Sequence, residues 1–123
     1  MFTTIFPILT TADLTAALGF YRDLLGATVN YEFAGPDGEP GYVGLELGAA
    51  HFGIGRDPDA VAETSERFAF WVYADDCDAA VERLRAAGVQ IVEDPIDQPW
   101  GERVARVLDP DGNLVYVGQR LAT

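Results

Sequence analysis

The chain has 123 residues and a mass of 13.3 kDa, and its 20 acidic and 8 basic residues give a net charge of −12 at pH 7. This length suits one domain with a sizeable core, and so acidic a surface disfavours nucleic acids and anionic membranes as partners. Every basic residue is arginine, which excludes catalysis by lysine. The single cysteine, Cys77, excludes an intrachain disulfide, and the single histidine, His51, excludes a metal site with several histidines within one chain.

The first half of the chain, residues 3–57, has the pattern of one strand, one helix and three further strands. An apolar run at residues 5–9 predicts the first strand. Asp13 can cap a helix by accepting backbone N–H bonds, and Gly26 can take the left-handed conformation that ends it. Helical spacing places an apolar stripe on Leu14, Leu18, Tyr21 and Leu25, and alternation predicts strands at residues 29–33, 42–47 and 50–55.

The second half, residues 67–119, repeats this order after a polar and acidic linker at residues 58–66. Asp75 or Asp76 can cap its helix, and Gly88 can end it. The strands are predicted at residues 68–74, 89–92, 103–108 and 113–118, with the turn Asp109–Gly112 before the last one. The sequence therefore predicts an α+β fold built from one βαβββ unit used twice.

These segments resemble a known family. Residues 9–14 and 20–26 are similar to the first module of the vicinal oxygen chelate superfamily, and residues 75–80 and 84–89 to its second module. Residues 109–114 match its signature turn. The superfamily includes glyoxalase I, extradiol dioxygenases, fosfomycin-modifying enzymes and bleomycin-resistance binding proteins. The resemblance implies a single domain, residues 1–123, of two βαβββ modules whose curled mixed sheets enclose a cleft, often within a homodimer.

The metalloenzymes of this superfamily hold a divalent ion on inward-facing His, Gln or Glu side chains at matched places in the two modules. The first-strand positions fall on Phe6 and Ala69 here, and the last-strand position falls on Tyr116. Phenylalanine, alanine and neutral tyrosine are not ligands for such an ion. His51 and Glu46, which the resemblance turns toward the cleft, supply fewer than the three protein ligands typical of catalytic zinc. We therefore expect no metal cofactor.

The resemblance turns aromatic side chains toward the cleft instead. Trp100, between Pro99 and Gly101, would lie at its mouth, as in the bleomycin-resistance branch, whose aromatic side chains sandwich flat heterocycles of the drug. Aromatic faces suit such a ligand because they offer apolar area with a defined stacking geometry. The predicted ligand-binding residues are Phe6, Tyr42, His51, Trp71, Tyr73, Trp100, Arg106 and Tyr116.

Several of these residues have structural alternatives. Core or dimer packing would also explain Trp71 and Tyr73, and Arg106 could pair with Glu46 rather than with a ligand carboxylate. A helix N-terminus can activate a thiol, but Cys77 matches an apolar position of the first module, which favours a buried structural role. The remaining arginines that we assign to the solvated surface are Arg56, Arg67 and Arg103.

Two functions follow, and the first is preferred. It is a metal-independent binding protein, without catalytic residues, that sequesters a bulky aromatic natural product or antibiotic as bleomycin-resistance proteins do. The alternative is a lyase, isomerase or oxygenase of the same superfamily with His51, Glu46 or Tyr116 as acid–base groups. A regulatory or structural partner domain is a third option.

The expected partners are a small aromatic molecule and a second copy of this chain, and neither nucleic acid nor membrane. The sequence has no apolar run of membrane-spanning length and no signal peptide at its start, so we expect a cytoplasmic protein.

Overall fold

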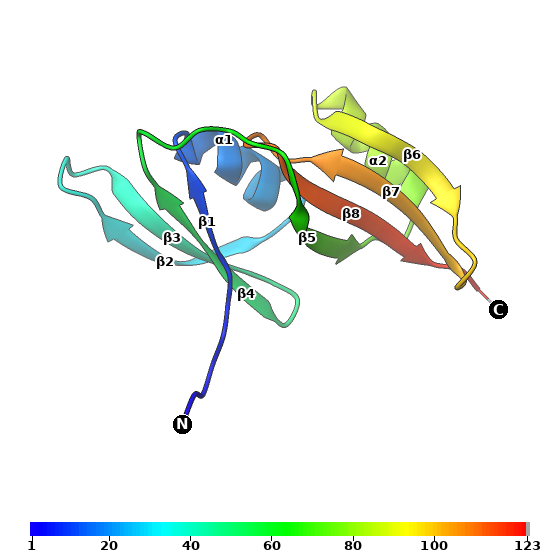
Figure 1. Cartoon of the computed structure of the whole chain (residues 1–123), viewed down its shortest axis with the longest axis horizontal. Helices are drawn as coiled ribbons and strands as arrows, with labels where there is room; N and C mark the ends of the chain where they lie inside the picture. The colour runs from blue at the N-terminus through cyan, green and yellow to red at the C-terminus, as the bar shows by residue number, and fades with distance from the viewer. Residues whose placement is uncertain (123) are drawn as a thin grey trace. The chain divides into compact units, whose positions relative to one another are not determined.

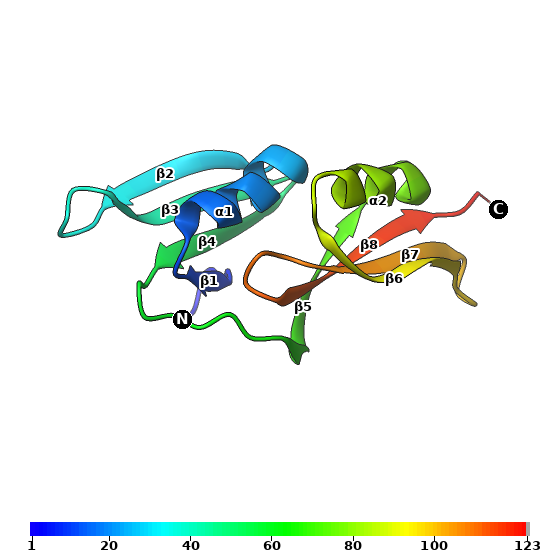
Figure 2. The same cartoon turned by 90° about the horizontal axis from the view of Figure 1, so that it is seen from above.

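The computed structural model describes residues 1–122, apart from the side chain of Glu66, and its chain forms two compact units. One unit spans Met1–Ala62, and the other begins at Glu63. Each unit holds one four-stranded mixed sheet with a helical segment on one face (Figures 1 and 2). Both sheets are open, and the α+β class and the repeated module are confirmed.

The first sheet has the strand order β1-β4-β3-β2, in which β1 is parallel to β4 and the other pairs are antiparallel. The Asp13 carboxylate accepts the backbone N–H of Ala16 and caps the first helix, as predicted. The elements are β1 (Ile8–Thr11), α1 (Leu14–Leu18), the π-helix η1 (Gly19–Leu24), β2 (Thr28–Ala34), β3 (Pro40–Leu47) and β4 (Ala50–Arg56).

The helical segment of this unit is wider than a regular α-helix. After Leu18 the backbone hydrogen bonds span five residues instead of four. The N–H of Leu25, for example, donates to the carbonyl of Phe20. The longer turn rotates the following side chains, so the predicted apolar stripe is buried at Leu14 and Tyr21 but only half-buried at Leu18 and Leu25. Phe20 and Tyr21 are buried, whereas Leu25 is half-buried.

The second sheet has the order β5-β8-β7-β6, with β5 parallel to β8. The Asp76 carboxylate caps its helix by accepting the N–H of Ala79. The elements are β5 (Ser65–Tyr73), α2 (Cys77–Ala86), β6 (Gln90–Asp97), β7 (Glu102–Leu108) and β8 (Asn113–Arg120). No helix in residues 1–122 is long and apolar enough to cross a membrane.

Several strand boundaries differ from the predictions, three of them by three residues or more. Strand β1 starts at Ile8, so Phe6 lies just before it rather than within it. Strand β5 starts inside the predicted linker, because Ser65 pairs with Asn113 before an irregularity in the ladder. Strand β6 continues through Pro95. Proline has no backbone N–H, and an edge strand such as β6 tolerates it because N–H groups that point away from the sheet have no partner in the ladder.

Each sheet buries one face against its helical segment and leaves the other face open. In the first unit, the buried side chains include Val43, Leu45 and Ile54, none of which is exposed. The second unit buries Val107 and Val115 in the same way. Strand alternation sends the neighbours of these residues to the opposite face, which we call the open face of each sheet.

Two surface arginines are held more firmly than expected. Arg103 forms ion pairs with Asp78, at the start of α2, and with Asp97, at the end of β6, and these bonds raise the pKa of its guanidinium. Arg56 pairs with Asp37 at 2.6 Å, and this hydrogen bond holds the pKa of the Asp37 carboxyl below its usual value. Both arginines therefore connect separate segments of their units.

Candidate binding site

The open face of the second sheet carries a stacked pair of aromatic rings. Trp71 on β5 and Tyr116 on β8 are direct partners in the parallel ladder, so strand pairing sets them side by side. Their ring centroids lie 5.0 Å apart with 12° between the planes, which is a stacked arrangement. The indole also lies over Gly118, where an added Cβ would come within 2.8 Å of the Trp71 Nε1 atom. Glycine at this position therefore leaves the room that the indole occupies.

Two further aromatic side chains meet beside this pair, at a single carboxylate. The Nε1–H of Trp100 donates to Glu102 Oε1 at 2.5 Å. Tyr73, whose ring centroid is 6.2 Å from that of Trp71, is also hydrogen bonded to Glu102, and this bond is the main reason that the pKa of its phenol is raised. The Arg120 guanidinium lies over the Tyr73 ring, 3.9 Å from its centroid, as a cation–π contact.

Arg106 lies on β7 opposite Tyr116 in the ladder. It forms an ion pair with Glu93 of β6, where Arg106 Nη2 is 3.6 Å from Glu93 Oε2. The alternative that the sequence suggested was a pairing of Arg106 with Glu46, and the carboxylate that the structure places beside Arg106 is that of Glu93. The guanidinium is thus not an uncompensated positive charge on this face.

The aromatic side chains of this face stay accessible to solvent. Trp71 is 41 % exposed, Tyr73 is 49 % exposed and Trp100 is 61 % exposed. Tyr116 is half-buried beneath its neighbours. We call Trp71, Tyr73, Trp100 and Tyr116 the aromatic cluster, and the structure brings these four predicted site residues together with Arg106 in one unit.

The other three predicted residues belong to the first unit. Tyr42 on β3 lies over Gly53 of β4 and meets the ring of Tyr31, with ring centroids 6.2 Å apart. His51 is exposed, and its Nδ1 atom is 3.8 Å from Glu46 Oε2. This part of the open face is therefore more polar than the aromatic cluster.

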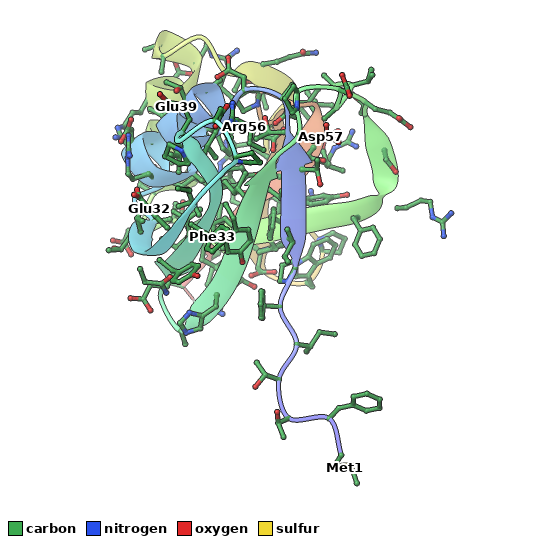
Figure 3. The ribbon with its side chains drawn as sticks, turned by 90° about the vertical axis from the view of Figure 1, so that its left-hand side faces the viewer. Met1, Glu32, Phe33, Glu39, Arg56 and Asp57 are labelled. Carbon is green, nitrogen blue, oxygen red and sulfur yellow. The ribbon has the colours of Figure 1, made fainter. Side chains whose placement is uncertain are left out.

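Phe6, the remaining residue, belongs to the segment that precedes β1. Figure 3 faces the first unit and shows this segment, which ends at Met1, extending away from the sheet, while Arg56 and Glu39 lie at the opposite end of the sheet. The Phe6 side chain is 47 % exposed. Its neighbour Pro7 is tied to the sheet, because the Pro7 carbonyl accepts the N–H of Gly53.

Sequence reasoning missed Glu102, Gly118 and Arg120. A signal for Glu102 was present, since it stands two residues after Trp100 and directly before the strand predicted at residues 103–108. The other two residues had none, because their roles depend on β5 side chains that lie over or under them in the folded sheet, namely Trp71 over Gly118 and Tyr73 beneath Arg120.

The side chains do not fit the metal centre that the family resemblance implies. The three implied ligand positions hold Phe6, Ala69 and Tyr116, none of which offers a suitable donor. Across the described residues, no group of three or more His, Cys, Asp or Glu side chains is arranged to hold an ion. His51 and Glu46 form only a pair, so no chemical step is derived through a metal.

Comparison with known proteins agrees with this fold. Residues 4–117 match the Glyoxalase/Bleomycin resistance protein/Dioxygenase superfamily. The chain belongs to this superfamily. A search of proteins with curated functions gives no match.

Solved structures of the superfamily cover almost the whole chain. A glyoxalase/bleomycin resistance protein/dioxygenase from Nocardioides is 27 % identical with a TM-score of 0.68, and covers 98 % of this chain and 85 % of its own. A protein of unknown function from Agrobacterium tumefaciens is also 27 % identical, with a TM-score of 0.76 and coverages of 98 % and 96 %. A bleomycin resistance determinant encoded on the transposon Tn5 is 24 % identical, with a TM-score of 0.68 and coverages of 97 % and 98 %, which shows a shared fold.

Proposed function

We propose that this superfamily member is a binding protein that holds a planar aromatic small molecule on the aromatic cluster of its second sheet, without a metal ion. Such a protein acts by sequestering its ligand, and the free energy of binding comes from stacking and from burial of apolar area. The ligand class that we propose includes bulky aromatic natural products and antibiotics.

The observation that carries the proposal is the stacked pair of Trp71 and Tyr116 on an open sheet face. A pair that served only to pack the core of this unit would be expected to be covered, because burial is what makes apolar area stabilising. Here the indole of Trp71 remains 41 % exposed, and Trp100, which is hydrogen bonded to Glu102, is 61 % exposed. Rings that are already aligned and still accessible offer a flat ligand a preformed surface, at little cost in side-chain ordering.

The fixed geometry of the cluster supports the same proposal. Trp71 is seated on Gly118, and Trp100 is held by a hydrogen bond to Glu102. Both tryptophans of the chain therefore have defined orientations in the absence of ligand. The likeness to the Tn5 bleomycin resistance determinant extends to the fold, and it makes bleomycin a reasonable first probe.

Tryptophan fluorescence tests the proposal directly, because the only two tryptophans both belong to the cluster. We expect saturable quenching by the planar dye proflavine or by bleomycin, equally strong with a chelator and with added zinc. Absence of saturable quenching with every planar compound tested, or quenching only when metal is present, would contradict the proposal.

A pair of variants localises the site. Replacing Trp71 and Trp100 with Ala should lower the affinity, measured by calorimetry, at least about tenfold, because two stacking faces are lost. Phe33→Ala, which removes an exposed aromatic ring from the first sheet, is the matched control and should leave the affinity unchanged. An unchanged affinity in the double variant, with a normal circular dichroism spectrum, would rule out this site.

The enzyme alternative rests on the His51–Glu46 pair, in which a carboxylate stands 3.8 Å from an exposed imidazole. A carboxylate beside a histidine is a common arrangement in acid–base catalysis. If the protein turns over a superfamily substrate, His51→Gln should abolish that activity and leave proflavine binding intact. Wild-type turnover that survives in His51→Gln would exclude this pair.

A further inference from the structure

We infer that Glu102 is the specificity-determining residue of this site, and that it selects planar aromatic ligands carrying a positively charged N–H group. The inference rests on the proposed function, because it describes which ligands the aromatic cluster accepts. It comes from the one carboxylate to which two members of the cluster are hydrogen bonded.

Glu102 is placed where a ligand on the cluster would meet it. Its carboxylate accepts the indole N–H of Trp100 at 2.5 Å and is hydrogen bonded to the Tyr73 phenol. These two aromatic side chains come from different segments, the loop before β7 and the end of β5. A flat molecule lying against both rings would therefore have its edge close to the carboxylate that joins them.

The carboxylate also has unused acceptor capacity. An ionised carboxylate has about four lone-pair positions, and the Trp100 and Tyr73 donors occupy two of them. The residue is half-buried, so part of its surface still meets solvent. A ligand N–H can bind there without displacing either aromatic side chain, and a charged N–H donor binds a carboxylate more strongly than a neutral one does.

The positive charges on the same face do not favour an anionic ligand. Arg106 is within 3.6 Å of Glu93, and Arg120 lies over the ring of Tyr73. The Arg106 guanidinium thus has a carboxylate as its counterpart, and Arg120, which stands opposite Glu102 in the ladder, lies over the Tyr73 ring. With a net charge of −12 on the whole chain, the long-range field also attracts cations.

Glu102 therefore has two separable roles. Its hydrogen bonds orient Trp100 and Tyr73, which any planar ligand requires. Its negative charge discriminates between ligands, which only a cationic ligand requires. Glu102→Gln keeps a side-chain carbonyl that can accept the Trp100 bond and removes the charge, whereas Glu102→Ala removes both.

The experiment measures affinities for two dyes with the same three-ring frame, by calorimetry at a pH where proflavine is cationic and acridine is neutral. Glu102→Gln should weaken proflavine binding about tenfold and leave acridine binding within about twofold, since one charge-assisted hydrogen bond is lost. Glu102→Ala should weaken both dyes. Glu82→Gln, which removes the same charge from the exposed side of α2, is the matched control and should change neither affinity appreciably.

The outcomes separate this inference from the proposed function. In one outcome, both dyes bind the wild type, but Glu102→Gln leaves the affinity for proflavine unchanged or lowers the affinity for both dyes equally. Glu102 then does not select for charge, while the proposed binding site is retained. If Glu82→Gln reproduces the loss, overall charge rather than Glu102 is responsible, and the inference is overturned. If neither dye binds the wild type, the inference falls together with the proposed function.

Discussion

The two units share their framework and differ in what the open face of each sheet displays. Asp13 and Asp76 cap the helices of the two units in the same way, and Gly26 and Gly88, both with φ of 89°, follow those helices. The first open face carries tyrosines with the exposed His51–Glu46 pair. The second carries a tryptophan stack with side chains gathered around one carboxylate.

This difference shows which positions maintain the fold and which are free to specialise. The helix caps and the apolar face toward the helix meet the same physical requirements in both units, so they keep similar residue types. The open face is not needed to bury the core, and its side chains can change without loss of the architecture. Function in this superfamily member is therefore sought on the open faces.

The largest expected effect tests whether the two cores are equivalent. Ile54→Ala in the first unit should lower the free energy of unfolding by about 2–5 kcal/mol, because it removes a fully buried side chain and leaves a cavity. Val117→Ala, at the matching place in the second unit, should cost less because a smaller side chain is lost. Urea denaturation measures both, with exposed Val61→Ala as the control. A negligible effect of Ile54→Ala would show that the first core is loosely packed.

A slightly smaller effect separates the two turns before the last strand of each unit. The buried Asp109 carboxylate accepts the N–H groups of Asp111 and Asn113 and the Asn113 side-chain amide. Asp109→Ala should cost about 2–3 kcal/mol, because these donors lose their acceptor. The first unit turns at Gly48 without such a carboxylate, so Ala49→Ser there should cost less than about 0.5 kcal/mol. Thermal denaturation of both variants would distinguish the turns, and equal losses would contradict this account.

The two glycines under aromatic rings give a sharper comparison. A Cβ at Gly118 would collide with Trp71, and a Cβ at Gly53 would collide with Tyr42, so either Ala substitution should cost about 1–3 kcal/mol. Only Gly118→Ala should also alter tryptophan emission and weaken proflavine binding several-fold. If Gly53→Ala has the same effect on the dye, the site is not confined to the second unit.

The smallest expected effect concerns Cys77, whose thiol is fully buried and donates to the Val117 carbonyl at 3.3 Å. Burial is the main cause that raises the pKa of this thiol, with the neighbouring Asp78 carboxylate adding to it. The folded state thus favours the neutral thiol. The stability that the neutral thiol contributes is fully present below the pKa of Cys77 in the unfolded chain, and it is lost as the pH rises through the higher pKa of Cys77 in the folded protein.

The corresponding measurement is the rate of alkylation of Cys77 by iodoacetamide at mildly alkaline pH. The native protein should react many times more slowly than the urea-denatured protein, because the thiolate is the reactive form and the buried thiol is neutral. Equal rates in the two states would show that the helix N-terminus exposes and activates the thiol instead.

Local features of the chain were predictable from the sequence, and so was the family. Both helix caps, the Asp109–Gly112 turn and the order of strands were predicted correctly, because each depends on residues that are neighbours in the chain. The start of β5 and the π-helix η1 were not predicted. Their hydrogen bonds depend on pairing with a distant strand and on packing against the sheet, which periodicity does not report.

The candidate site likewise has one part that was predictable from the sequence and one part that was not. The family resemblance, which the sequence alone carries, implied that the metal-ligand positions fall on Phe6, Ala69 and Tyr116, and the chemistry of these side chains makes them unsuitable ligands whatever the fold. Only the tertiary structure decided that Trp71 stacks on Tyr116 and that Glu102 joins Trp100 to Tyr73. These contacts link segments far apart in the chain, and their geometry follows from strand register, which sets which side chains stand side by side.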